Sequence, residues 1–392
     1  FCRMMQKKSN TIVKVDIVIP SKDRSMQLHL LLESMNKYIK GMGRITITYQ
    51  SSSNNFRKGY ELLKKRVLTD VSFSNLRENS DSIVFRSRKS LPEAYDAFMD
   101  SGDSDYIMPL IDDEVFIRDY NLINDAASKY FFANDEVLAC AIRLGDNLSD
   151  QLSWTLDDGV FYDNPRGHAN SLLSNGKPRF ISPILGHEIS ESIMLNYKKQ
   201  EYLLWEWPAN LNVPHWSCIF STTAHLYRKS LYLKMYEMFG RDSFMEIEYK
   251  GFEYLKKQYL KKVEKKSISS VIYYFLFFEK YFNRFEEKII GERFGFTKYG
   301  IFEILLFKIL CRGNLLSVKN IPHLMVSPRK SVSVNVDYDS SHFRPGDKKI
   351  GATLNSYYLS GKIFRLDEIS SMDYFFPKQY LMERSYREYN SR

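Results

Sequence analysis

The sequence predicts an α/β fold in which a mixed, mostly parallel sheet is flanked by helices. Short β-rich runs alternate with segments of helical apolar spacing from residue 14 to residue 111, as in folds where a helix connects parallel strands. The fourth of these runs, Tyr106–Ile111 (YIMPLI), is wholly apolar, which is typical of a strand buried on both faces. The chain is 44% hydrophobic and 26% charged, so it can bury a core and is not globally disordered.

Each of the first two predicted strands precedes a predicted helix. Lys14–Pro20 (KVDIVIP) is a β-rich run that ends at its proline, and Met26–Tyr38 then has apolar residues at helical spacing. Ile45–Tyr49 (ITITY) is the second strand. A Ser-Ser-Ser-Asn-Asn loop follows it after one residue, and the amphipathic pattern of Gly59–Val67 predicts the second helix.

The next strand, helix and strand lead to an acidic cluster. Ser82–Phe85 predicts a strand, Pro92–Met99 a helix and Tyr106–Ile111 the fourth strand. The acidic triplet Asp112–Glu114 comes directly after this strand. Ligands of parallel-sheet folds bind beyond the carboxyl ends of the strands, so the triplet is a candidate site.

The pattern becomes less regular after the acidic triplet. Val137–Arg143 (VLACAIR), Leu203–Trp207 and Cys218–Thr222 predict short strands, and His225–Phe239 predicts a helix. A long stretch rich in Asp, Asn, Gly and Pro lies at 145–177. Loops of this length usually have a function or move.

Composition divides the chain into four parts. Residues 1–13 form a polar tail without the apolar core of a signal peptide. Residues 14–250 carry the α/β pattern, and 251–313 form a basic, aromatic, helical insertion. Residues 314–392 are expected to complete the α/β domain or to pack on it.

Charge and cysteine usage limit the possible partners and compartments. The net charge of +9 points to a polyanionic partner, a phosphorylated substrate or an acidic membrane surface. The cysteines Cys2, Cys140, Cys218 and Cys311 form no C-x-x-C pair, which argues against a structural zinc site and a disulfide-dense secreted module. We therefore expect a reducing, cytosolic compartment. The longest apolar run, Val271–Phe278, is far shorter than the roughly 20 residues that span a bilayer.

The three carboxylates at 112–114 need a compensating charge. Neighbouring carboxylates repel one another unless a metal ion or a positive group lies between them. Oxygen ligands favour Mg²⁺ or Mn²⁺, and Mg²⁺ is usually shared with substrate phosphates. The alternative is an acidic loop that begins a helix, where carboxylates are favourable.

Several short motifs occur in the order and spacing of family-2-like glycosyltransferases of the GT-A fold, and the sequence most resembles a bacterial, mostly uncharacterised group of them. The shared motifs are Asp16–Arg24 (DIVIPSKDR), Tyr49–Ser53, Lys58–Tyr60 (KGY), Ile111–Phe116 (IDDEVF), Arg143–Asn147 (RLGDN), Trp205–Trp207 (WEW), Asn320–Pro322 (NIP), Leu354–Asn355 and Tyr358–Gly361 (YLSG). The resemblance covers most of residues 14–250 and 314–370 and leaves out the basic insertion. It implies a GT-A (Rossmann-like) fold that holds a nucleotide-sugar donor across the carboxyl-end edge of the sheet.

The resemblance also assigns donor-binding residues. Pro20, Ser21 and Arg24 would lie against the base and ribose, with Ser51 near the end of the second strand. Arg88 would approach the base or the phosphates.

In the same comparison, a divalent metal (Mn²⁺ or Mg²⁺) bridges the diphosphate of the donor. Asp113 and Glu114 would hold this metal, and Asp112 would lie nearer the ribose. Glu114 stands where the family usually has Asp, and its side chain is longer by one methylene.

Sugar transfer also needs a base that deprotonates the acceptor hydroxyl. The family's base lies in an acidic motif at the start of a helix, which Glu246 matches best, with Glu248 in reserve. Solvated helix carboxylates are the alternative. His225 would contact the diphosphate, the metal or the acceptor. Related sequences tend to have Asp-Gly-His where this chain has Thr223-Ala224-His225, so reduced, altered or absent activity is an open alternative.

The pair Trp205 and Trp207 allows two interpretations. Residues two apart on a strand point to the same face, so the pair would stack on a sugar of the acceptor or pack in the core.

The segment Lys256–Arg312 carries thirteen Lys and Arg against six Asp and Glu. It would pack its aromatic faces on the rest of the protein, or lie on an anionic membrane surface as a pair of interfacial helices. Nucleic-acid binding is disfavoured, since no helix-turn-helix, RNP or zinc-knuckle pattern accompanies the charge.

The sequence thus favours a metal-dependent, inverting glycosyltransferase that transfers a sugar to a glycan or lipid-linked acceptor in bacterial surface polysaccharide or glycolipid assembly. Its expected location is the cytoplasm, or the inner face of the membrane if the basic insertion binds lipid. A catalytically weakened GT-A domain that serves as a scaffold is the second hypothesis. A nucleotidyltransferase is disfavoured, because Ser21–Ser25 contains no glycine for a phosphate loop.

Overall fold

The computed structural model describes residues 13–88, 102–144, 201–207, 224–239, 324–335 and 347–367, with shorter pieces at 154–155, 161–162, 172–174, 177–179, 219–220, 247–251, 254–255, 322 and 386–389. The helix predicted at Pro92–Met99 and the basic insertion Lys256–Arg312 lie outside these residues.

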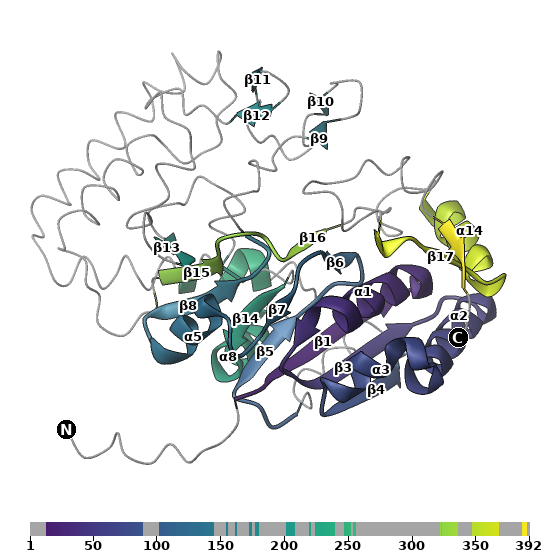
Figure 1. The fold of residues 1–392 in the computed structure, drawn as a ribbon, viewed down its shortest axis with the longest axis horizontal. Helices are drawn as coiled ribbons and strands as arrows, with labels where there is room; N and C mark the ends of the chain where they lie inside the picture. Colours follow the sequence, from purple (N-terminus) through teal and green to yellow (C-terminus); the bar gives the residue numbers. More distant parts are fainter. Residues whose placement is uncertain are drawn as a thin grey trace, which may run out of the picture.

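The described residues form an α/β fold around an eight-stranded sheet (Figure 1). The strand order is β13 (Tyr202–Glu206), β15 (Leu324–Pro328), β8 (Val137–Ala141), β14 (His225–Arg228), β5 (Tyr106–Pro109), β1 (Val15–Lys22), β3 (Met42–Gln50) and β4 (Ser82–Ser87). Strands β5, β1, β3 and β4 are parallel, whereas β14 is antiparallel to both β5 and β8. The predicted mixed, mostly parallel sheet is therefore confirmed.

Helix α1 (Ser25–Tyr38) lies in the core, because other elements cover it on several sides. Helices α2 (Asn54–Thr69), α3 (Ser74–Glu78) and α14 (Asp347–Leu359) all pack against it. Ten of its residues are buried as a result, including the polar His29 and Ser34.

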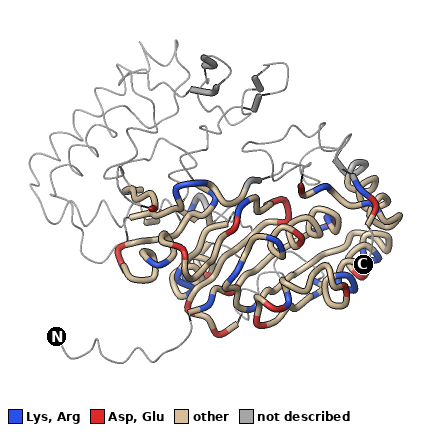
Figure 2. The backbone as a smooth tube through the Cα atoms, viewed as in Figure 1, with Lys and Arg blue, Asp and Glu red and all other residues tan. Residues whose placement is uncertain are grey.

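Shorter elements complete the described part of the chain. These are 3-10 helix η1 (Val71–Phe73), helices α5 (Ala126–Ala133) and α8 (Lys229–Phe239), π-helix η3 (Ile247–Gly251), and the strand pairs β2 (Ile39–Lys40) with β7 (Tyr120–Asn121), β6 (Glu114–Phe116) with β16 (Ser333–Asn335), β9 (Trp154–Thr155) with β10 (Phe161–Tyr162), β11 (Leu172–Ser174) with β12 (Lys177–Arg179) and β17 (Lys362–Phe364) with β18 (Tyr386–Glu388). The stretch 145–177, expected to be irregular, thus contains short paired strands. Figure 2 shows basic and acidic residues interspersed over the described elements.

The C-terminal part of the chain belongs to the same core as the N-terminal part. Strand β15 lies within the main sheet, next to β8. Leu354, Tyr358 and Phe364 are buried in the hydrophobic cluster that also contains the residues of β1 and α1.

Two predictions around residues 218–239 are wrong in part. His225–Arg228 forms the strand β14 rather than the start of a helix, and α8 begins at Lys229. Pairing with β5 and β8 on its two sides holds this run extended. Within the predicted strand Cys218–Thr222, the described residues Ile219 and Phe220 lie in a turn.

Helix α2 begins earlier than its apolar pattern indicated. It starts at Asn54 instead of Gly59, because the Ser53 hydroxyl caps its first turn by accepting a hydrogen bond from the Phe56 N–H at 3.4 Å. Apart from the half-buried Phe56, its first turn is polar and exposed, so apolar spacing alone did not reveal it.

The order of the parallel strands marks one edge of the sheet as a candidate ligand-binding region. Strand β3 lies on one side of β1 and β5 on the other, so the direction of strand addition reverses at β1. In open α/β sheets, ligands bind beyond the carboxyl ends of the strands at such a reversal.

No helix in the described residues is both long enough and apolar enough to cross a membrane.

Candidate nucleotide-binding site

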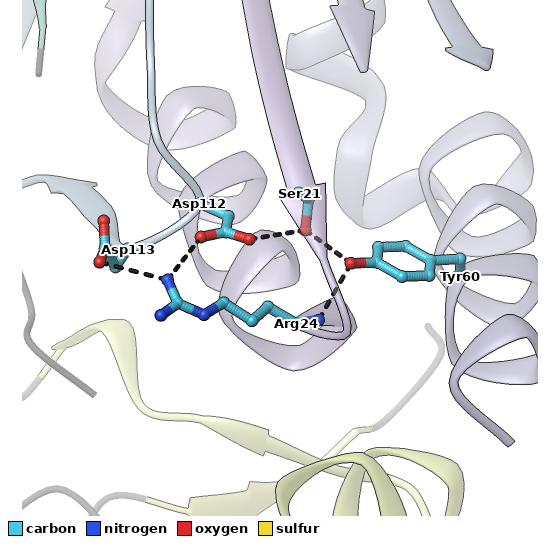
Figure 3. Close-up of polar contacts among 5 residues, drawn as sticks. All are labelled: Ser21, Arg24, Tyr60, Asp112 and Asp113. Atoms are coloured by element: carbon cyan, nitrogen blue, oxygen red, sulfur yellow. Dashed lines mark hydrogen bonds and ion pairs between the residues drawn. The ribbon is translucent and has the colours of Figure 1, made fainter. Parts of the chain in front are cut away.

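Five polar side chains meet where β1 and β5 end (Figure 3). The Arg24 guanidinium donates through Nη1 to Asp112 Oδ1 at 2.9 Å and to Asp113 Oδ2 at 3.3 Å. The Ser21 hydroxyl donates to Asp112 Oδ2 at 2.7 Å and lies 2.7 Å from the Tyr60 hydroxyl. We call these five residues the switch-point cluster.

Local structure brings the cluster together. Ser21 is near the end of β1, and Arg24 precedes the first residue of α1. Between them Asp23 has a positive φ of 59°, and its carboxylate accepts the Ser52 N–H at 2.7 Å, which ties the β1–α1 turn to the loop after β3. Asp112 and Asp113 form the turn after β5.

Tyr60 reaches the cluster because α2 packs closely on α1. A Cβ added at the preceding Gly59 would lie 2.3 Å from Asn355 Oδ1 and 2.5 Å from Ser25 Oγ, so no larger residue fits there without movement. The glycine of the K-G-Y motif thus permits the contact that places the tyrosine.

The hydrogen bonds of the cluster have a fixed direction. The Tyr60 oxygen accepts the Arg24 N–H at 3.0 Å, and its own hydrogen goes to the Ser21 oxygen, because Ser21 uses its hydrogen on Asp112. Ser21 in turn donates to Asp112. Each Asp112 oxygen therefore accepts one bond, from Ser21 and from Arg24 respectively.

Burial and charge set the ionisation of the cluster. Desolvation disfavours the guanidinium of Arg24, but the charges of Asp112 and Asp113 outweigh it and hold the pKa of Arg24 above its usual range. Burial and the charge of Asp112 raise the pKa of Tyr60 well above its ordinary value. At neutral pH the cluster therefore contains a charged Arg24 and a protonated Tyr60.

Glu114 does not join the other two carboxylates. It is fully buried at the start of β6, and among the described residues neither of its oxygens makes a hydrogen bond of ordinary geometry. Burial raises the pKa of Glu114, and the nearby Arg143 and Ser333 only partly oppose this rise. Within the described residues, no group of three or more His, Cys, Asp or Glu side chains is arranged to hold a metal ion.

Three other predicted donor-binding residues lie at the carboxyl ends of the parallel strands or close to them. Pro20 lies within β1, opposite Thr48 of β3. Ser51 follows β3 directly, and Arg88 follows β4 and donates its N–H to the Tyr49 carbonyl at 2.8 Å. Ser51 Oγ and Arg88 Nε are buried, and neither has a hydrogen-bond partner within the part of the chain that the structure describes. Unsatisfied buried polar atoms at a predicted binding edge are available to a ligand.

The predicted catalytic residues are placed less completely. His225 is 2% exposed on β14, and its ring stacks on Tyr227 with the centroids 6.1 Å apart. Tyr227 pairs with Ile107 of the antiparallel strand β5, so His225, two residues before Tyr227, lies toward the carboxyl end of β5. Glu246 lies outside the described residues, as does the side chain of its reserve, Glu248.

The tryptophan pair is part of the core. Trp205 is 2% exposed and Trp207 fully buried, and the Trp207 indole donates to the Pro322 carbonyl at 3.1 Å. Of the two interpretations, core packing is the one that this burial supports.

Sequence reasoning missed the roles of Tyr60 and Asp23. Tyr60 was visible only as the third residue of the K-G-Y motif, and Asp23 only as part of the first-strand motif. Tyr60 contacts Ser21 and Arg24, which are 39 and 36 residues away in the chain. Asp23 contacts Ser52, which is 29 residues away.

No protein-family model matches this chain, and it has no match among curated proteins.

Proposed function

We propose that this protein is a metal-dependent glycosyltransferase that uses a nucleotide-sugar donor. The observation that carries the proposal is the switch-point cluster, a buried set of charged and hydroxyl groups at the reversal of strand order. The motifs shared with GT-A glycosyltransferases support the same assignment. A glycan or lipid-linked acceptor and an inverting transfer follow from that resemblance and are part of the proposal.

The chain's own residues suit an anionic donor. Arg24 supplies a buried positive charge at the cluster, and Arg88 and Ser51 offer donors at the ends of β4 and β3 that no described residue satisfies. A phosphate or ribose hydroxyl that meets these groups exchanges its water for preorganised partners, which is favourable when the partners are already ordered.

The carboxylates fit a shared metal only through Asp113. Its side chain is 16% exposed, whereas Asp112 is held by Ser21 and Arg24 and Glu114 is buried. One carboxylate together with substrate phosphates is a known way to hold Mg²⁺. A divalent ion bound there would neutralise the departing diphosphate.

The test is a melting-temperature panel of UDP, GDP, CMP and TDP with and without Mn²⁺. A ligand at 100 times its Kd stabilises the folded state by about 2.7 kcal/mol. We expect one nucleotide to raise the melting temperature only with Mn²⁺, and Asp113→Asn to abolish the rise. Asp119 is exposed and lies three residues after the end of β6. Asp119→Asn is therefore the control variant, and it should retain the rise in melting temperature. A panel without any shift would contradict donor binding.

A scaffold without transferase activity is the second candidate. The burial of Glu114 favours it, because the third carboxylate of the motif is withdrawn from the position that the metal-binding hypothesis gave it. This candidate predicts nucleotide binding or partner binding without turnover. Turnover would be measured as nucleotide release from the sugar-linked forms of the same four nucleotides, and we would then expect none.

A further inference from the structure

The positive charge between Asp112 and Asp113 is supplied by the protein itself. Arg24 Nη1 lies 2.9 Å from Asp112 Oδ1 and 3.3 Å from Asp113 Oδ2 (Figure 3). The side chains of Arg24, Asp112 and Asp113 are only 10%, 6% and 16% exposed. The guanidinium therefore occupies the place in which carboxylate repulsion would otherwise favour a metal ion.

The contacts of Arg24 with Asp112 and with Asp113 differ in strength. The bond to Asp112 is shorter, and Asp112 is itself fixed by Ser21, whose hydroxyl belongs to the chain of bonds from Tyr60. The backbone N–H of Arg24 is also anchored, to the Tyr60 oxygen. The contact with Asp113 is longer and involves the most exposed of the three side chains. Asp113 is thus the carboxylate that Arg24 can release at the least cost.

A divalent ion that approaches Asp113 alone meets an unfavourable field. It must compete with Arg24 for the carboxylate, and its charge is repelled by a guanidinium that is shielded little by water. A diphosphate changes this balance, because its oxygens accept bidentate hydrogen bonds from a guanidinium and also coordinate a divalent ion.

We propose that Arg24 makes divalent-metal binding at Asp113 conditional on a bound diphosphate. Without the anion, Arg24 holds Asp113 and keeps the metal out; with it, the guanidinium turns from Asp113 to the phosphate while the Asp112 contact remains. Arg24 is in this role a positioning residue that couples two ligands. The inference rests on the proposed function, which supplies the diphosphate. It concerns how the binding of metal and of diphosphate depend on each other, and not the transfer of the sugar.

The first measurement is calorimetric titration of Mn²⁺ into the full chain without any anion. We expect Arg24→Gln to bind Mn²⁺ about tenfold more tightly than wild type, within the range of typical coupling between two sites. Asp113→Asn in the Arg24→Gln background should remove that gain, which locates it at this carboxylate. Arg57→Gln is the matched control, since Arg57 is an exposed arginine on α2 that contacts Asn54 and Glu61 outside the cluster. Unchanged or weaker Mn²⁺ binding by a folded Arg24→Gln would overturn the proposal.

The second measurement uses the wild type, so it does not depend on whether an Arg24 variant folds. Melting temperatures are compared with Mn²⁺, with inorganic pyrophosphate and with the preformed Mn²⁺–pyrophosphate complex. We expect the complex to stabilise the protein by more than the two separate shifts together. Equal stabilisation by Mn²⁺ alone and by the complex would overturn the coupling.

The outcomes separate this inference from the proposed function. Coupled binding of Mn²⁺ and pyrophosphate with no response to any nucleotide would keep the role of Arg24 and contradict the glycosyltransferase. A metal-dependent nucleotide shift together with an Arg24→Gln variant that gains no Mn²⁺ affinity would support the glycosyltransferase and contradict the role of Arg24.

Discussion

Tyr60 shows how much of the candidate site depends on a single hydroxyl. It accepts the backbone N–H of Arg24 and donates to Ser21, so it orients both residues that hold Asp112. Tyr60 is fully buried, and its ring stacks on Tyr49 with the centroids 4.6 Å apart. The ring is therefore fixed independently of the hydroxyl, which makes the two contributions separable.

Tyr60→Phe should destabilise the protein by about 1–3 kcal/mol, because it leaves the Arg24 N–H without its acceptor in a buried place. Tyr49→Phe is the matched control: it keeps the stacked pair of rings and removes none of the cluster's hydrogen bonds, so its effect should stay within about 0.5 kcal/mol. Urea unfolding of the two variants provides the comparison. Equal losses in both would show that the hydroxyl of Tyr60 has no special role.

At the scale of elements, the sequence predicted the strands and helices that local patterns specify. The alternation over residues 14–111 identified β1, α1, β3, α2, β4 and β5, and it placed Ser21 and the acidic triplet at the strand ends. It failed where distant pairing decides. β14 is extended because β5 and β8 flank it, and Glu114 is withdrawn from its neighbours because β6 pairs with β16. The sequence named Arg24 but could not show that its partners are Asp112 and Asp113.

The contact between α1, α2 and α14 gives the prediction for this scale. Gly59→Ala places a Cβ 2.3 Å from Asn355 Oδ1 and should cost about 1–3 kcal/mol through overpacking, although alanine has the higher helix propensity. Gly351→Ala is the matched control, since Gly351 also lies within a helix but no described residue comes within 4 Å of the added Cβ. It should stabilise the protein by about 0.5–1 kcal/mol. Chemical denaturation that shows the same sign for both would contradict the close packing of α2.

At the scale of the whole molecule, the C-terminal part closes over the N-terminal half. His29 of α1 is hydrogen-bonded to the Tyr358 hydroxyl of α14 at 3.0 Å. Arg66 of α2 lies over the rings of Tyr358 and Tyr389, 4.7 and 3.9 Å from their centroids. Residues more than three hundred positions apart thus share one buried junction, and unfolding of either part exposes His29.

This junction makes the stability of the molecule depend on pH. Burial, followed by the charges of Arg66 and Arg387 and opposed by Asp70, lowers the pKa of His29 to about 3. The folded state therefore keeps His29 neutral, whereas the unfolded chain takes up a proton below its ordinary pKa of 6.5. Because the unfolded state binds more protons, this group favours unfolding increasingly as the pH falls from 6.5 toward 3, with a slope of about 1.4 kcal/mol per pH unit.

His29→Gln removes this contribution, so the free energy of unfolding of wild type should fall more steeply than that of the variant between pH 6.5 and 4.5. Parallel curves from urea titrations at successive pH values would mean that His29 is accessible to protons in the folded protein, and that the C-terminal part does not seal the junction.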